Sequence, residues 1–168
     1  MRVTLWKILV LASVMLAGAI GNAETLPATA GEALSGRRLV LADAVRGHAA
    51  ILVVAFTKQA GDSSKAWAQA IRADSALAGL ELFSVAMLGQ APGLVRGMIK
   101  SSIRKGLTPA EQDSFVVITQ DEKLWRRYLN VIVENDTYVV LLDAAGQVRW
   151  QGHGQAKDLE PLLRIAKH

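Results

Sequence analysis

The sequence predicts an α/β fold in which helices flank a central mixed β-sheet. Residues 49–56 and 80–87 are apolar runs of strand length, as in strands that are buried on both faces. A helical segment lies between them, and a crossover of this length makes the two strands parallel neighbours. Near the C-terminus, the turn at 143–146 separates two short strands, which predicts an antiparallel hairpin.

The first 23 residues have the features of a secretory signal peptide. Arg2 and Lys7 precede the apolar run 8–20, and small residues stand at 21–23. This run is short for a permanent membrane anchor, because a spanning helix needs about 20 apolar residues. An uncleaved anchor is the alternative. The sequence therefore predicts a periplasmic or secreted protein.

Composition excludes several classes of function. The chain of 168 residues has no cysteine, which excludes thiol redox chemistry, iron–sulfur clusters and cysteine zinc sites. The formal net charge of +4 falls to +2 (17 − 15) without Arg2 and Lys7, so nucleic acid is not an expected partner. The histidines are scattered, and no metal or cofactor is expected. His153, between two glycines, is the one histidine that is a candidate for ligand or acid–base work, and the alternative is a plain surface position.

The first half of the mature chain is expected to begin with a loose leader, residues 24–36, before a single domain at 37–168. Residues 38–43 predict the first strand, followed by the buried strand 49–56. Residues 57–61 are expected to form a loop, after which Asp62 or Ser63 would cap a helix. The apolar face of that helix would consist of Ala66, Trp67, Ala70 and Ile71.

Residues 93–105 predict an amphipathic helix with two sets of side chains. The apolar stripe is Leu94, Val95, Met98, Ile99 and Ile103, beside the cations Arg96, Lys100 and Arg104. No acidic residue lies between Glu81 and Glu111. One interpretation packs the stripe on the sheet and leaves the cations in solvent. In the other, the cations contact an acidic partner or anionic lipid headgroups.

The second half continues the same α/β pattern. The segment from Thr108 to Glu111 is a capping box with proline at the first helical position. A strand at 115–119 follows, and Asp121 is expected to cap the next helix, which carries Leu124, Trp125, Tyr128 and Leu129. Strands at 137–142 and 148–150 form the hairpin. A helix at 157–167 would close the chain with Leu159, Leu162, Leu163 and Ala166 facing the core.

Residues 41–67, an apolar strand that runs into a loop and a Trp-bearing helix, resemble the first half of a thioredoxin-like fold. Thioredoxins and peroxiredoxins place a reactive cysteine at the start of that helix, where the helix dipole lowers the thiol pKa. Residues 58–64 fill that place here. The usual cis-proline of the fold corresponds to Thr137. The reactive cysteine and the cis-proline that are typical of the oxidoreductases are thus both missing.

Residues 93–107 and 128–156 resemble the thioredoxin-like assembly factors of the mitochondrial ATP synthase membrane sector. In that family, a basic helix precedes a strand, and the C-terminal signature reads approximately Tyr-x-x-Leu-Leu-Asp-x-x-Gly-x-x-Arg-Trp-x-Gly-x-Gly. This chain supplies Tyr138, Leu141, Leu142, Asp143, Gly146, Arg149, Trp150, Gly152 and Gly154 in register. The resemblance covers roughly residues 38–168.

The resemblance implies a redox-inactive binding or assembly protein without catalytic residues, whose partner is a protein and could be a membrane protein. The expected contact residues are Arg96, Lys100, Arg104 and Lys105, extended by Arg126, Arg127 and Arg149. Two alternatives remain: an oxidoreductase relative with an unrecognised activity, and a peripheral module on an anionic membrane surface. The mitochondrial proteins act from the matrix side, whereas a signal peptide would deliver this domain to the opposite face.

Overall fold

A sheet of seven strands, in the order β2-β1-β5-β4-β3-β6-β7, forms the centre of the computed structural model, which describes residues 25–156 and 159–166. The strands are β1 (Ala30–Ala33), β2 (Arg38–Val40), β3 (Ala50–Ala55), β4 (Glu81–Met87), β5 (Phe115–Ile118), β6 (Thr137–Leu142) and β7 (Val148–Gly154). Strand β4 runs parallel to β3 and β5, and the other neighbouring pairs are antiparallel. This arrangement confirms the predicted α/β fold with a central mixed sheet. The predicted signal peptide, residues 1–23, lies outside the described residues.

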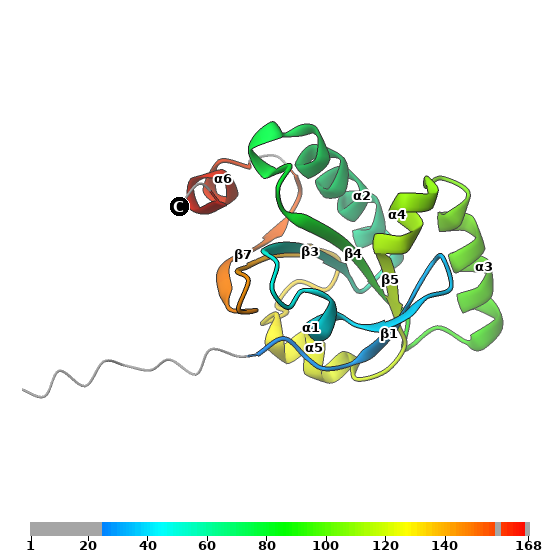
Figure 1. Cartoon of the computed structure of the whole chain (residues 1–168). Coiled ribbons are helices and arrows are strands. Elements are labelled where there is room, and N and C mark those ends of the chain that lie inside the picture. The colour runs from blue at the N-terminus through cyan, green and yellow to red at the C-terminus, as the bar shows by residue number, and fades with distance from the viewer. Residues whose placement is uncertain (1–24, 157–158, 167–168) are drawn as a thin grey trace, which may run out of the picture.

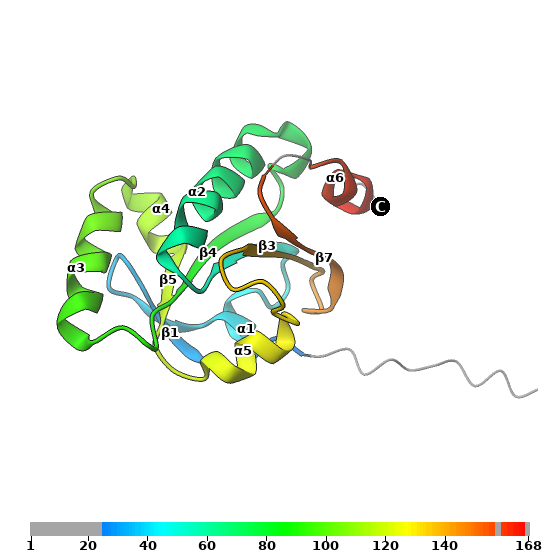
Figure 2. The same cartoon turned by 180° about the vertical axis from the view of Figure 1, so that it is seen from behind.

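Helices cover both faces of the sheet (Figures 1 and 2). They are α1 (Leu41–Ala44), α2 (Lys58–Ala73), α3 (Gly93–Arg104), α4 (Pro109–Ser114), α5 (Glu122–Tyr128) and α6 (Glu160–Ala166), with a 3-10 turn, η1, at Ser75–Leu77. Helices α2 and α6 lie on one face, and α1 and α5 lie on the other. Helix α3 stands at the end of the sheet, next to β1, with its outer side turned away from the domain (Figure 1).

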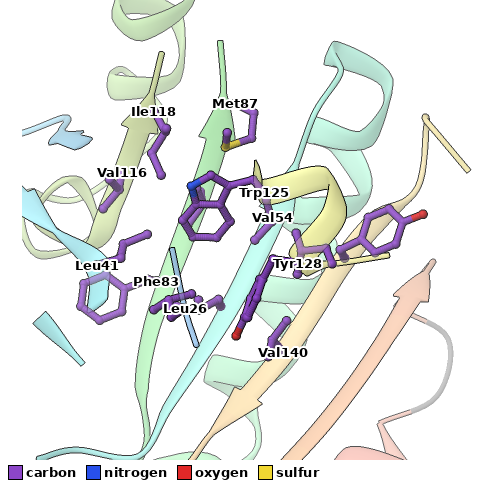
Figure 3. Close-up of a cluster of buried hydrophobic side chains, with 14 of the residues drawn as sticks. Leu26, Leu41, Val54, Phe83, Met87, Val116, Ile118, Trp125, Tyr128 and Val140 are labelled. Atoms are coloured by element: carbon purple, nitrogen blue, oxygen red, sulfur yellow. The ribbon is translucent and has the colours of Figure 1, made fainter. Parts of the chain in front are cut away.

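Two apolar clusters hold these layers together. The first lies under α1 and α5, where Leu26 and the fully buried Trp125 meet sheet residues such as Val54 and Ile118 (Figure 3). The second lies under α2 and α6, where Trp67 and Leu162 pack against the opposite face of the sheet. Strands β3 and β6 are buried along their whole length, because they contribute side chains to both clusters.

The leader predicted at 24–36 is not loose, because it contributes a strand to the sheet. Strand β1 lies between β2 and β5, and Leu26 and Leu34 are buried on either side of it. The segment AGEA has no β-branched residue, so strand propensity gave no signal. A Cβ on Gly31 would lie 2.5 Å from Val116 Cγ1; the missing side chain is what allows β1 to approach β5.

Two boundaries near the first strands differ from prediction. The strand expected over 38–43 ends at Val40, and the buried Leu41 begins the short helix α1. The loop expected over 57–61 is absent, because α2 begins at Lys58 and Thr57 is its N-cap. The Thr57 hydroxyl accepts a hydrogen bond of 3.1 Å from the Ala60 amide. The predicted caps Asp62 and Ser63 therefore lie inside the helix.

The second half follows the prediction closely. The capping box is confirmed, since Thr108 Oγ1 accepts from the Glu111 amide and Glu111 Oε2 accepts from the Thr108 amide. Strand β6 has its predicted bounds, and β7 continues to Gly154, beyond the predicted end at 150. Asp121 does not cap α5 with its side chain, because Asp121 Oδ2 accepts a hydrogen bond from Thr29 Oγ1. Helix α6 buries Leu162 as predicted, while residues 157–158 and 167 of the predicted helix lie outside the described residues.

Candidate functional site

The start of α2, where related folds carry a reactive cysteine, is held by hydroxyl contacts. Thr57 Oγ1 caps the helix and donates to Asn135 Oδ1 at 3.0 Å. The fully buried Thr137, at the cis-proline position, donates from Oγ1 to the Ala60 carbonyl at 2.8 Å. The chain has no cysteine, so these groups cannot exchange disulfides. Their geometry ties α2 to β6 and the preceding loop.

Three cations of the predicted contact surface turn toward the domain. Arg96 donates to the carbonyl oxygens of Ala91 at 2.6 Å and Gly89 at 2.8 Å. Lys100 Nζ lies 2.7 Å from Glu32 Oε1, and Arg104 Nε donates to the Leu34 carbonyl at 2.9 Å. These bonds join α3 to β1 and to the loop that precedes α3. The sequence did not predict them, because the acceptors Glu32 and Leu34 belong to the segment assigned to a loose leader.

Positive charge is concentrated around Glu32. The hydrogen bond from Lys100 lowers the pKa of the Glu32 carboxyl below its ordinary value, partly opposed by desolvation, and the charges of Lys100, Arg38 and Arg104 lower it further. A single carboxylate thus faces three cations. The region between α3 and β1 keeps an excess of positive charge that an anionic partner group could meet.

The opposite side of α3, which we call the α3 outward face, is uncovered and carries two large apolar side chains, Leu94 and Met98. Its residues are Leu94, Gly97, Met98, Ser101, Ser102 and Lys105, which line a shallow hollow of about 480 Å³. The side chains of Leu94 and Met98 are 83% and 67% exposed. Ile99 and Ile103 are half-buried on the inner side. The predicted apolar stripe is therefore split between the two sides of the helix.

The remaining predicted contact residues have different surroundings. Arg126 lies 4.7 Å above the Phe56 ring and pairs with Glu122 and Glu134, so it joins α5 to its neighbours. Arg127 is exposed on the same helix. The structure does not bring Arg126, Arg127 and Arg149 into a contact cluster with the cations of α3.

Arg149 lies on β7, where it is 56% exposed and 3.9 Å from Asp143 Oδ2. A contact of that length at the surface contributes little to stability. The Arg149 guanidinium is therefore available to a partner.

The C-terminal signature has a structural role. The indole of Trp150 lies over Gly152, where an added Cβ would be 2.6 Å from Trp150 Cζ2 and Cη2. The carbonyl oxygen of Gly154 accepts hydrogen bonds from Trp67 Nε1 at 2.9 Å and Ser63 Oγ at 3.1 Å. Gly152 thus leaves room for Trp150, and the Gly154 carbonyl links β7 to α2.

His153 is paired, with its Nδ1 2.7 Å from Asp136 Oδ2 and its ring stacked on Tyr138 at 5.2 Å. Across residues 25–156 and 159–166, no group of three or more His, Asp or Glu side chains could hold a metal ion. In the same part of the chain, no helix is both long and apolar enough to cross a membrane.

Comparison with known families gives one match that spans most of the chain. The family model described as ATP10 protein matches residues 20–166. This range includes β1, α3 and the C-terminal signature. No curated protein matches.

Solved structures with the same fold are distant in sequence. The thioredoxin domain of a thiol-disulfide oxidoreductase from Bacteroides vulgatus is 14% identical with a TM-score of 0.59, over 84% of this chain and 94% of that one. BsSco, of the Sco family of cytochrome c oxidase assembly proteins, is 10% identical with a TM-score of 0.57, over 85% and 91%. The exposed lipoprotein thioredoxin Etrx1 of Streptococcus pneumoniae is 14% identical with a TM-score of 0.56, over 82% and 96%. These likenesses establish a thioredoxin-like fold.

Proposed function

The chain belongs to the ATP10 protein family, and from this membership we propose that it is a redox-inactive thioredoxin-like protein that assists the assembly of a membrane protein complex. It would act by holding one protein subunit of that complex during incorporation. The first complex to test is ATP synthase, which the resemblance of the basic helix and the C-terminal signature implies.

The observation that carries this proposal is the start of α2. In this fold, thiol chemistry depends on a cysteine at that helix start, and here Thr57 and Thr137 use their hydroxyls for hydrogen bonds that fix the helix. The scaffold is retained without a sulfur atom that could react. A function in binding fits these contacts better than a function in electron transfer.

Three of the predicted contact cations are exposed and hold no helix in place: Lys105, Arg127 and Arg149. We assign the long-range attraction of an anionic partner to these three. Arg96, Lys100, Arg104 and Arg126 act indirectly, because their hydrogen bonds hold α3 and α5 in place. The partner would approach a positively charged surface. Because salt screens this attraction, the association rate should fall as salt is added.

We place this protein in the periplasm or outside the cell, on the features of residues 1–23. An exported lipoprotein is among the proteins that share its fold. Sequencing the N-terminus of the mature protein after cell fractionation tests this assignment. A chain that starts near residue 24 in the periplasmic fraction supports it, and a chain that starts at Met1 in the cytosol overturns it.

Deletion of the gene followed by native gel analysis of the membrane complexes tests the function itself. We expect one complex, ATP synthase first, to accumulate as subcomplexes, and the full chain to restore it. A chain with Lys105, Arg127 and Arg149 replaced by Ser should restore less. Complexes that assemble normally without the gene would overturn the proposal.

A further inference from the structure

We propose that the α3 outward face is the docking surface for an apolar α-helix of the partner protein, one that carries a carboxylate at one end. This inference rests on the proposed binding function and names the surface and the chemistry it recognises.

Helix α3 leaves part of its apolar stripe uncovered. A surface helix ordinarily turns its apolar side toward the core. Here the inner side half-buries Ile99 and Ile103, and Leu94 and Met98 are left largely exposed. Lys100 and Arg104 hold this orientation through hydrogen bonds of 2.7 and 2.9 Å to the segment around β1, so the helix cannot turn Leu94 and Met98 inward without breaking them.

The α3 outward face is hollowed beside Gly97. Gly97 has no neighbour that excludes a side chain, since a Cβ added there meets nothing within 4 Å. Glycine weakens a helix interior, so the fold of this domain gives no reason for it. Together with Ser101, it leaves a hollow between Leu94 and Met98. Small residues between larger apolar ones allow the backbone of a second helix to approach closely.

The hollow carries one positive charge. The only charged residue that lines the hollow is Lys105, which has no ion pair within the described part of the chain. Helix α3 itself contains no acidic residue. A second copy of this face has no carboxylate to meet Lys105, which disfavours a second copy of the chain as the occupant. A carboxylate at the end of an apolar helix complements Lys105.

The length of the face fits a helix rather than a membrane surface. From Leu94 to Lys105, α3 rises by about 16 Å, or about three turns, which matches a short helix–helix contact. An anionic bilayer would attract Lys105 and accept Leu94 and Met98, but it gains nothing from a hollow at Gly97. The observations therefore favour a helix.

Binding of a defined peptide to the full chain tests the docking surface. The probe is a fluorescein-labelled helical peptide of about 20 residues with one Leu/Ala face and a pair of Glu at one end, measured by fluorescence anisotropy. Gly97→Leu fills the hollow and favours the helical conformation, so we expect at least about tenfold weaker binding with the fold intact. Leu124→Gln removes an exposed apolar side chain from α5 and is the matched control, which should bind like the wild type.

A charge exchange tests recognition of the carboxylate. Lys105→Glu should lose affinity for the Glu-ended peptide and gain it for a matched peptide that ends in Lys. Equal binding of both peptides by both proteins, or full binding by Gly97→Leu, would overturn the inference. Vesicles with anionic lipid are the competing surface. The wild type and Gly97→Leu could both bind the vesicles while neither binds a peptide. That result would assign the face to membranes and would also overturn the inference.

The two proposals fail in different ways. If the full chain restores complex assembly and Gly97→Leu both restores it and binds the peptide normally, only the docking surface is wrong. If the peptide results are as expected but complexes assemble without the gene, only the proposed function is wrong.

Discussion

The indole Nε1 of Trp67 on α2 donates a hydrogen bond of 2.9 Å to the carbonyl oxygen of Gly154 at the end of β7. Ser63 Oγ donates to the same oxygen. Two donors from the first crossover helix thus meet one acceptor in the C-terminal signature. These hydrogen bonds join the C-terminal signature to α2.

Replacing Trp67 with Phe should lower the free energy of unfolding by more than about 1 kcal/mol, because the hydrogen bond to Gly154 is lost and the smaller ring leaves a cavity in the core. Urea denaturation measures the difference. Ser63→Ala should cost less, since Trp67 still satisfies the carbonyl. The double variant should lose more than the sum of the single losses, because the carbonyl then has neither donor; strict additivity would argue against a shared acceptor.

Gly152→Ala should displace the Trp150 indole, because the new methyl group would overlap its ring. We expect a change in tryptophan fluorescence and a loss of about 1–3 kcal/mol in the free energy of unfolding. Trp150→Ala supplies the control background, in which Gly152→Ala should cost much less. An equal cost in both backgrounds would contradict the packing of Trp150 over Gly152.

Thr57→Ala should lower the free energy of unfolding by about 1 kcal/mol, because α2 loses the hydroxyl that caps its N-terminus. Asp62→Ala, at the cap expected from sequence, should change it by less than about 0.5 kcal/mol. Thermal and urea unfolding of the two variants side by side measure this. A larger loss of stability for Asp62→Ala than for Thr57→Ala would indicate that the helix is capped at Asp62, as the sequence predicted.

Glu32→Gln should reduce stability near neutral pH but not in acid. The Lys100 ammonium lowers the pKa of the Glu32 carboxyl below its ordinary value of 4.5, so this carboxylate stabilises the folded state above that pH. The stabilisation is lost as the pH falls through the lowered pKa. The difference in free energy of unfolding between wild type and Glu32→Gln should therefore shrink below about pH 4.5.

Lys100→Met provides the control for this pH dependence. In that background the ammonium is gone, and Glu32→Gln should have a smaller effect with little dependence on pH. Urea titrations from about pH 3 to 7 on all four proteins complete the comparison. A pH dependence that persists without Lys100 would assign it to another group.

Much of the fold was predictable from local patterns. The apolar runs at 49–56 and 80–87 predicted the buried strands β3 and β4, since strands covered on both faces are apolar along most of their length. The capping box at Thr108 and Glu111 needs four consecutive residues and no tertiary contact. Strand β1 was not predicted, because its sequence, AGEA, contains no residue that favours strands. It forms a strand because Gly31 lets the backbone lie close to β5.

The sequence predicted which residues α3 carries, but not which side of α3 faces the domain. Sequence placed the cations of α3 beside an apolar stripe, and periodicity fixes such faces relative to each other. It does not say which face lies against the domain. That depended on Glu32 and the Leu34 carbonyl, 68 and 70 residues before their partners Lys100 and Arg104.

The sequence by itself determined the fold class, the hairpin, and the absence of sulfur chemistry, because each depends on residue type or on spacing along the chain. Only the tertiary structure decided that the α3 cations turn inward and that Leu94 and Met98 remain uncovered. The physical reason is that the acceptors of Lys100 and Arg104 are distant in sequence and meet α3 only after the sheet has formed.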